Sequence, residues 1–223
     1  MNGLRAVIFD VDGVLVDSYA AHLRSWLELA KETGIAFAER DFALTFGRTS
    51  REILRQYWPA SDEAAVRRLD HRKEAIYREL IRADFPAMAG AVALIDSLLA
   101  EGFALGVGSS GPPENVELVL EKLGKRGAFA AIITGDDVTR GKPDPQVFLL
   151  AADRIGIEPA RCTVIEDAPA GIVAARAAGM KAIALLSTGR SQRDFAGVAC
   201  DLVVSALGEL RIDHFTTDAP RAK

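Results

Sequence analysis

The amino-acid sequence predicts an α/β protein, with a Rossmann-like core around a parallel sheet and a small helical cap domain inserted into it. Two observations lead to this fold class. Short apolar runs alternate with helical segments over most of the chain, which is typical of a parallel sheet covered by helices on both faces. A long stretch between Ser18 and Asp84 breaks this alternation, because it contains helical patterns and no strand-like run.

Six apolar runs are expected to form the buried strands of the sheet. They cover residues 6–9, 104–108, 130–134, 163–166, 181–185 and 202–204. The helical segments between them have matching start and stop signals: "SSGPPENVELVLEKLG" has prolines near its first turn and ends at Gly124, and "KPDPQVFLLAADRIG" ends at Gly156. We therefore assign residues 1–16 and 88–223 to the α/β core and residues 17–87 to the cap.

The cap interrupts the chain directly after the first strand. Gly34, Gly47 and Pro59 divide it into helical pieces. An insertion of roughly 65–70 residues is too long for a loop and is expected to form a domain of its own. Ligands of open α/β sheets bind at the carboxyl ends of the strands, so a domain inserted at that end is expected to act as a lid.

Composition excludes several classes of function. The 223 residues carry a formal net charge of −4, so no basic face for nucleic acid is expected. No apolar run approaches the ~18 residues of a membrane span, and Asp10 and Asp12 interrupt the N-terminal apolar run that a signal peptide would need. Cys162 and Cys200 are too few for a disulfide framework. We expect a cytoplasmic monomer that binds neither membranes nor nucleic acid.

Polar side chains follow several of the predicted strands and are expected to meet at one edge of the sheet. They are Asp10 and Asp12 after the first strand, Ser109 after the second, Lys142 in the loop "RGKPDP", and Glu166 and Asp167 at the end of the fourth. Clustered carboxylates beside a hydroxyl and an ammonium suit a divalent ion next to a phosphoryl group. Mg²⁺ is the expected ion, because it binds few carboxylates together with water and phosphate oxygens.

The same residues resemble a known family. "FDVDGVLVDS", "VGSS", "GKPDP" and "VIEDAPAG", in this order, are similar to the four motifs of the haloacid dehalogenase-like hydrolase superfamily. The helical insertion after the first motif resembles the small cap of its phosphatase and β-phosphoglucomutase-like branch. The resemblance covers essentially the whole chain and implies the α/β core with a helical cap.

The resemblance implies a role for each motif residue. Asp10 would be the nucleophile that forms an aspartyl-phosphate, and Asp12 would protonate the leaving oxygen and then deprotonate the attacking water. Gly13 would turn the backbone away from the strand, and Ser109 would bind the phosphoryl oxygens, helped by N–H groups at the start of its helix. Lys142 would pair with Asp10 and the phosphoryl group.

The metal ligands follow from the same resemblance. Asp167, the Asp10 carboxylate and the Asp12 carbonyl would bind Mg²⁺, and Glu166 would act at or beside the metal. Asp12 also narrows the reaction, because the dehalogenase and phosphonate-cleaving branches do not need a carboxylate at this position. Phosphate-ester chemistry is therefore expected.

Three cap residues, His22, Arg51 and Lys73, are candidates for substrate binding. Ser18, His22 and Trp26 lie on one face of a helix, and "DSYAAHLRSW" resembles the cap start of β-phosphoglucomutase-like enzymes. Arg51 and Lys73 stand where those mutases use cationic residues on a distal phosphate. The loop "SSGPPEN" departs from the mutase pattern, because Pro112-Pro113 replaces a Lys-Asn pair, and this favours a phosphatase.

Simpler interpretations of several residues remain open. Asp17 is expected to be a hinge or helix N-cap residue, and Ser110 is either a substrate ligand or an N-cap. His22 is either a substrate contact or a structural histidine. Arg51 and Lys73 are either ligands or solvated helix charges. Asp136 and Asp137, in "TGDDVTRG", are expected to shape the loop before Lys142, or one of them supports the metal through water.

The leading hypothesis is a Mg²⁺-dependent phosphatase of a small phosphorylated metabolite, a sugar phosphate or a phosphoglycolate-like ester. A β-phosphoglucomutase-like phosphosugar mutase is the alternative in the same class. A phospho-aspartate signalling module is a further alternative, although such modules have about half this length and no cap. A non-catalytic binding protein is disfavoured because all the motif residues are intact.

Overall fold

The computed structural model describes residues 4–45 and 49–217. The chain divides into two compact units, one formed by Met1–Asp17 and Ala87–Lys223 and the other by Ser18–Pro86. No helix of the described residues has the length and apolar character needed to span a membrane. The first unit is an α/β core, and the second consists of helices.

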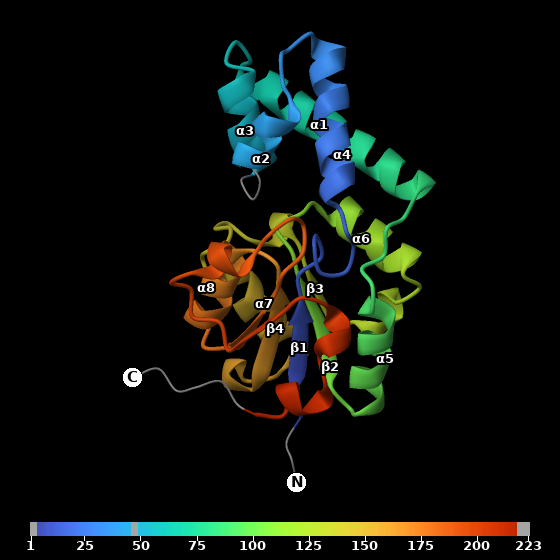
Figure 1. Ribbon diagram of the computed structural model, residues 1–223, viewed down its shortest axis with the longest axis vertical. Coiled ribbons are helices and arrows are strands. Elements are labelled where there is room, and N and C mark those ends of the chain that lie inside the picture. Colours follow the sequence, from blue (N-terminus) through green and yellow to red (C-terminus); the bar gives the residue numbers. More distant parts are fainter. Residues whose placement is uncertain (1–3, 46–48, 218–223) are drawn as a thin grey trace. The chain divides into compact units, whose positions relative to one another are not determined.

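The core contains a six-stranded parallel sheet in the order β3-β2-β1-β4-β5-β6. Figure 1 shows β1 between β2 and β4. Its strands are β1 (Ala6–Phe9), β2 (Ala104–Gly108), β3 (Ala131–Ile133), β4 (Cys162–Glu166), β5 (Lys181–Leu185) and β6 (Leu202–Val204). All six predicted strands are present, with changes of a single residue at the ends of β3 and β4. The predicted α/β fold class with a parallel sheet is confirmed.

The central position of β1 explains its sequence. All four of its residues are buried, since it has a neighbouring strand on each side and helices over the sheet. Its register aligns Phe9 with Val107 of β2 and with Ile165 of β4. The residue after Phe9 is thereby placed at the carboxyl edge, at the middle of the sheet.

Among the described residues, four α-helices belong to the core: α5 (Ala91–Ala100), α6 (Pro113–Lys122), α7 (Gln146–Ile155) and α8 (Pro169–Ala177). Helices α7 and α8 pack against each other and share one apolar cluster with the sheet, which includes Ile8, Phe148 and Ile172. Helix α7 approaches β2 closely, because a Cβ at Gly108 would lie 2.9 Å from the Phe148 ring. Glycine in β2 therefore allows this contact.

The second unit contains α1 (Tyr19–Thr33), α2 (Glu39–Thr45), α3 (Ser50–Tyr57) and α4 (Glu63–Ala83). Its core is aromatic, with Trp26, Phe37 and Trp58 in mutual ring contact, and Trp58 Nε1 donates to Thr33 Oγ1 at 2.9 Å. Gly34 ends α1 in a left-handed conformation, as its sequence position predicts. Gly47, the second predicted breaker, lies outside the described residues.

For Asp17 and Ser110 the N-cap interpretation is wrong, and the hinge interpretation of Asp17 stays a prediction. Ser18, and not Asp17, holds the N-cap position of α1, and its side chain makes no capping hydrogen bond. Pro112, and not Ser110, holds the N-cap position of α6. Asp17 and Ser110 are both exposed. In each case the helix begins one or more residues later than an N-cap at Asp17 or Ser110 would require.

Candidate active site

The turn after β1 brings Asp10 and Asp12 to the carboxyl edge of the sheet. Asp10 is buried, and its backbone N–H donates to the carbonyl of Ile165 at 3.0 Å, which extends the pairing with β4 by one residue. The chain then turns at Gly13, whose φ of 77° lies in the left-handed region that favours glycine. The Gly13 N–H closes the turn on the carbonyl of Val16 at 2.8 Å. The sheet thus fixes Asp10, and the turn fixes the backbone of Asp12.

Lys142 joins two carboxylates at this edge. Its Nζ lies 2.7 Å from Oδ1 of Asp10 and 2.7 Å from Oε1 of Glu166. The three side chains are 8%, 9% and 2% exposed, so water screens these interactions weakly. The ammonium also lies 4.9 Å from the centroid of the Phe148 ring. Residues far apart in the sequence therefore form one buried ionic cluster.

Asp167 adds a further carboxylate. Asp10, Glu166 and Asp167 each offer a carboxylate oxygen within 4.8 Å of the others, and all three residues are buried. Burial raises the pKa of Asp10 well above its ordinary range, against the lowering effect of Lys142. Burial and the neighbouring Glu166 raise the pKa of Asp167 to about 7. Burial alone would lower the pKa of Lys142, but Asp10 and Glu166 reverse this and raise it.

The charge of this cluster fits a divalent cation. Three buried carboxylates face the buried ammonium of Lys142. Burial is the main cause of the raised pKa values of Asp10 and Asp167, and repulsion from the neighbouring carboxylates adds to it. Oxygen donors without a nitrogen or sulfur ligand suit a hard ion such as Mg²⁺. Asp10 and Asp167 are therefore the carboxylates with which this site would bind one, and Glu166 would lie at or beside it.

Two glycines make room for the cluster. A Cβ at Gly13 would overlap Oδ2 of Asp167, and a Cβ at Gly171, in the first half of α8, would overlap Oε1 of Glu166. Gly171 has no positive φ, so its small size and not its backbone conformation is what matters. Any residue larger than glycine at either position would collide with the neighbouring carboxylate.

Ser109 stands at the carboxyl end of β2 and is buried. Its N–H donates to the Ile133 carbonyl at 3.0 Å, and its Oγ accepts the N–H of Gly111 at 3.0 Å. A Cβ built at Gly111 would lie 3.3 Å from Ser109 Oγ and 3.7 Å from Oδ2 of Asp12. Asp12 is half-buried, and its carboxylate therefore extends toward the loop after β2.

The start of α6 is poor in hydrogen-bond donors. Pro112 and Pro113 have no N–H, and the N–H groups of Asn115 and Val116 donate to the Pro112 carbonyl at 3.1 and 3.3 Å. The N–H groups expected to help Ser109 are therefore fewer than a helix start usually offers. An anion beside Ser109 would rely more on the loop residues and on Lys142.

The loop after β5 reaches the same cluster and was not expected from the sequence. Thr188 Oγ1 donates to Oδ2 of Asp167 at 2.6 Å, and Ser187 Oγ donates to the Gly13 carbonyl at 2.6 Å. Nε of Arg190 lies 3.9 Å from Oδ2 of Asp167. The polar stretch "STGR" follows the fifth apolar run. The expectation that polar residues after a strand lie at the carboxyl edge of the sheet therefore applies to it as well.

A family model described as haloacid dehalogenase-like hydrolase matches residues 4–179 of the chain. The chain belongs to this family. Residues of three of the four motifs meet in the buried cluster, and the motif "VGSS" places Ser109 next to Gly111, which also adjoins Asp12. This haloacid dehalogenase-like hydrolase lies in the branch of phosphatases and phosphoglucomutases, as its similarities indicate.

Two relatives and a solved structure illustrate the range of this branch. The chain is 32% identical over 213 residues to validoxylamine A 7'-phosphate phosphatase of Streptomyces hygroscopicus subsp. limoneus, covering 94% of this chain and 97% of the relative. It is 33% identical over 219 residues to β-phosphoglucomutase of Bacillus subtilis (strain 168), covering 94% and 93%. The crystal structure of β-phosphoglucomutase from Clostridium difficile aligns with a TM-score of 0.83 at 25% identity, covering 95% of each chain.

In the helical unit of the hydrolase, Lys73 is buried among polar and aromatic partners. It is 2% exposed, and its Nζ lies 2.9 Å from Nδ1 of His22 and 2.8 Å from Oε1 of Glu74. The His22 ring stacks on Tyr77 with centroids 4.1 Å apart. An ammonium can only donate, so Nδ1 of His22 must accept. The interpretation of Lys73 as a solvated charge is therefore wrong.

Arg51 differs from Lys73. Its side chain is 59% exposed, and its Nε donates to Oδ2 of Asp70 at 3.2 Å. Burial raises the pKa of Asp70, against the lowering effect of Arg51. Arg51 thus remains available to solvent, and Lys73 does not.

The loop before Lys142 is shaped by Asp137. Oδ2 of Asp137 accepts the N–H and the hydroxyl of Thr134, each at 2.9 Å, and Oδ1 accepts from Arg154 at 2.9 Å. The hydrogen bond from the Thr134 N–H lowers the pKa of Asp137, and this effect outweighs the raising effect of burial. Asp136 is exposed. These contacts agree with the expected role of the pair in loop shape.

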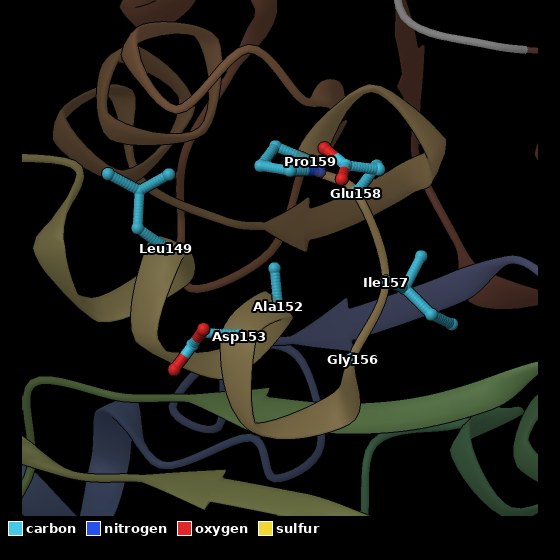
Figure 2. A pocket seen from close by; sticks show the side chains of 7 residues that line it. All are labelled: Leu149, Ala152, Asp153, Gly156, Ile157, Glu158 and Pro159. Carbon is cyan, nitrogen blue, oxygen red and sulfur yellow. The ribbon is translucent and has the colours of Figure 1, made fainter.

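A pocket of about 450 Å³ lies elsewhere on the core, between the end of α7 and the segment before β4 (Figure 2). Its lining residues are Leu149, Ala152, Asp153, Gly156, Ile157, Glu158 and Pro159. This segment leads into the amino end of β4, whereas the carboxylate cluster lies at the carboxyl ends of the strands. The pocket is therefore separate from the ionic cluster.

Proposed function

We propose that this chain is a Mg²⁺-dependent phosphatase that hydrolyses a small phosphorylated metabolite, a sugar phosphate or a phosphoglycolate-like ester, through an aspartyl-phosphate intermediate. The observation that carries this proposal is the buried contact of Lys142 with both Asp10 and Glu166. A carboxylate nucleophile for phosphorus must be kept ionised and beside a cation that offsets the charge of the phosphoryl group.

In the first step an oxygen of Asp10 attacks phosphorus, and the bond from phosphorus to the ester oxygen breaks. Asp12 gives its proton to that leaving oxygen, which departs as an alcohol. In the second step Asp12 takes a proton from water, whose oxygen attacks phosphorus, and the bond to Asp10 breaks to release inorganic phosphate. Support for Asp12 in both steps comes from its half-buried carboxylate, whose Oδ2 lies beside Gly111 in the loop after β2.

Other residues of the core have supporting roles in this mechanism. Lys142 orients Asp10 and stabilises charge on the phosphoryl oxygens, and Ser109 with Ser110 and the Gly13 turn surrounds the phosphoryl group. Asp10, Asp167 and the Asp12 carbonyl would bind Mg²⁺, and Glu166 would act at or beside the metal. When bound, the ion neutralises charge on the cluster and polarises the phosphoryl group.

In the helical unit, we assign Arg51 and His22 to substrate contact, with Lys73 acting beside His22. Support comes from the exposure of Arg51 and from the 2.9 Å contact between Lys73 and His22. An Arg51→Met variant should raise KM and leave the melting temperature unchanged, because exposed ion pairs contribute little to stability. Arg72→Met, which removes another exposed cap arginine paired with Glu32, is the matched control.

A phosphosugar mutase is the second candidate, favoured by the 33% identity to β-phosphoglucomutase. Two facts favour the phosphatase. Pro112-Pro113 replaces the Lys-Asn pair of the mutase pattern, and the relative of almost equal identity is a phosphatase. A mutase must also protect its aspartyl-phosphate from water until a sugar accepts the phosphoryl group.

The experiment is a phosphate-release screen over phosphorylated metabolites with Mg²⁺ and with EDTA. Asp10→Asn should abolish release and keep the circular dichroism spectrum of the wild type. Isomer formation that depends on a sugar bisphosphate and releases no phosphate would establish the mutase instead. Activity that EDTA leaves unchanged would refute the metal assignment. A wild-type chain that binds phosphate esters but turns none over would be a binding module.

We also propose that the enzyme acts as a monomer in the cytoplasm. The net charge of −4 and the two free cysteines support this assignment. Size-exclusion chromatography with light scattering should give a mass near 23.9 kDa. A mass of twice that value at micromolar concentration would contradict it.

A further inference from the structure

The loop after β5 contains a residue in a backbone conformation that its side chain disfavours. Thr188 has φ of 55°, and within residues 4–45 and 49–217 no other non-glycine residue has a positive φ. A β-branched side chain in the left-handed region is strained. Such strain persists only where neighbouring contacts require it, so the partners of Thr188 indicate its purpose.

These partners belong to the carboxylate cluster and to the turn after β1. The Thr188 hydroxyl donates to Oδ2 of Asp167 at 2.6 Å, and Arg190 Nε lies 3.9 Å from the same oxygen. The preceding residue, Ser187, donates to the Gly13 carbonyl at 2.6 Å. The Thr188 methyl group is 3.0 Å from the place where a Cβ of Gly13 would stand. The strained turn therefore fits closely around Asp167 and Gly13.

Both contacts to Asp167 fall on Oδ2. The other carboxylates are engaged in a similar way: Lys142 donates to Oδ1 of Asp10, and Glu166 accepts from Lys142 on Oε1 and from the Ala168 N–H on Oε2. Donors of the protein therefore already engage one oxygen of Asp10, one of Asp167 and both of Glu166. The oxygens that these donors leave for a cation are Oδ2 of Asp10 and Oδ1 of Asp167.

We propose that Thr188 is a positioning residue of the metal site, which holds Oδ2 of Asp167 so that this carboxylate offers a single oxygen to a cation and the site prefers Mg²⁺ to Ca²⁺. This inference rests on the proposed function, in which Asp167 is a metal ligand. Ca²⁺ takes six to eight oxygens and often binds a carboxylate through both of them. Mg²⁺ needs fewer carboxylate oxygens and keeps several waters.

The test measures metal binding and not turnover. Isothermal titration calorimetry of the full chain, without substrate, gives the Kd for Mg²⁺ and for Ca²⁺. Thr188→Val keeps the shape and the strain but loses the hydroxyl, so Mg²⁺ binding should weaken about 10–100-fold, as is usual when a hydrogen-bond partner of a metal ligand is lost. Ca²⁺ binding should weaken less, because Asp167 is then free to use both oxygens. The preference for Mg²⁺ should therefore shrink.

Two further variants complete the design. Thr188→Ser retains the hydroxyl and should keep both affinities near those of the wild type. Thr216→Val makes the same exchange at an exposed threonine whose hydroxyl donates to the Asp213 carbonyl, and should change neither affinity. Thr188→Gly removes the hydroxyl and the strain together, so it should fold at least as stably as the wild type and still bind Mg²⁺ weakly.

Wild-type Mg²⁺ affinity and an unchanged preference in Thr188→Val would overturn the inference. If that variant does not fold, the same result in Thr188→Gly would overturn it. A wild-type chain that does not bind Mg²⁺ would also overturn it, together with the metal assignment. A chain that binds Mg²⁺ as expected and releases no phosphate from any ester would refute the phosphatase and leave the role of Thr188 intact.

Discussion

Nζ of Lys142 lies 2.7 Å from Oδ1 of Asp10, and the two side chains are 8% and 9% exposed. A charge buried to this extent must be compensated locally, because bulk water cannot reach it. The pair lies at the carboxyl edge of the central strand, where the family motifs converge. Each member therefore depends on the other for its ionised form, and this dependence can be tested on either side.

Lys142→Met removes the cation and keeps the length of the side chain. Asp10 and Glu166 would lose their shared partner, so phosphate release should fall by about 10²–10³-fold or more. The free energy of unfolding should fall by about 3 kcal/mol, in the range for breaking a buried ion pair. Lys125→Met is the control, because the pair of Lys125 with Asp96 is more exposed and should cost less than about 1 kcal/mol. Turnover within a few-fold of wild type in Lys142→Met would contradict the mechanism.

Metal-free protein should lose stability as pH rises from 5 to 8. Burial raises the pKa of Asp10 and brings that of Asp167 to about 7, whereas an unfolded chain has an aspartate pKa of about 3.9. Between these values the folded state keeps a proton that the unfolded state has lost. The free energy of unfolding therefore decreases with pH, and the part that Asp167 contributes levels off above about 7. Thermal unfolding in EDTA at four pH values in this window measures the slope.

Mg²⁺ should oppose this loss, because a bound cation replaces the proton on the carboxylate. The rise in melting temperature on adding saturating Mg²⁺ should be larger at pH 8 than at pH 5. Asp167→Asn should flatten the metal-free slope, and Asn at the exposed position Asp136 should leave it unchanged. A metal-free melting temperature that increases from pH 5 to pH 8 would be incompatible with these buried carboxylates.

Asp12→Asn should affect substrates according to their leaving groups. The proposed role of Asp12 is to protonate the departing oxygen, so an alkyl phosphate should lose about 10²–10⁴-fold in rate. An aryl phosphate with an acidic phenol needs no such proton and should lose less in the first step. Its aspartyl-phosphate should then accumulate, since the water of the second step has lost its base. Equal losses for both substrates, without a burst of phenol, would remove Asp12 from proton transfer.

Gly171→Ala tests the space that α8 leaves for Glu166. Alanine normally stabilises a helix relative to glycine by about 0.5–1 kcal/mol. Here the added methyl group would overlap the Glu166 carboxylate, so the variant should instead lose about 1–3 kcal/mol, together with most of its activity. Gly127→Ala, at a site with no atom within 4 Å and no positive φ, should remain within about 0.5 kcal/mol of wild type. Chemical denaturation of both variants decides between these outcomes.

The fold was predictable because its signals are local. Uninterrupted apolar runs define the strands, and the polar residue that follows each run reaches the carboxyl edge. Asp10 and Asp167 could be placed together on this basis, and Lys142 could be placed near them. Helix α2 was not separated from its neighbours, because the seven residues of Glu39–Thr45 are too few for a clear helical period.

The parts of the site that were missed depend on distant contacts. Thr188 acts on a carboxylate 21 residues earlier in the chain, and no local pattern marks its conformation. Gly171 lies within "VIEDAPAG", but it matters because it leaves space for the Glu166 side chain, which the sequence does not reveal. Lys73 and Arg51 received the same two interpretations, although Lys73 lies on the same helical face as the buried residues Val66 and Tyr77. A lysine on an apolar face is a signal for burial that the charge pattern obscured.

The central place of β1 has a consequence for how the chain is made. Among the described strands β1 comes first in the sequence, yet it pairs Ala6 with Ala104 and with Cys162. During synthesis this apolar strand must wait for both neighbours, and the ordering of distant segments is slow. Refolding should therefore be slow and prone to aggregation at high protein concentration. A nascent chain can have no working site until the last of its strand ends has left the ribosome.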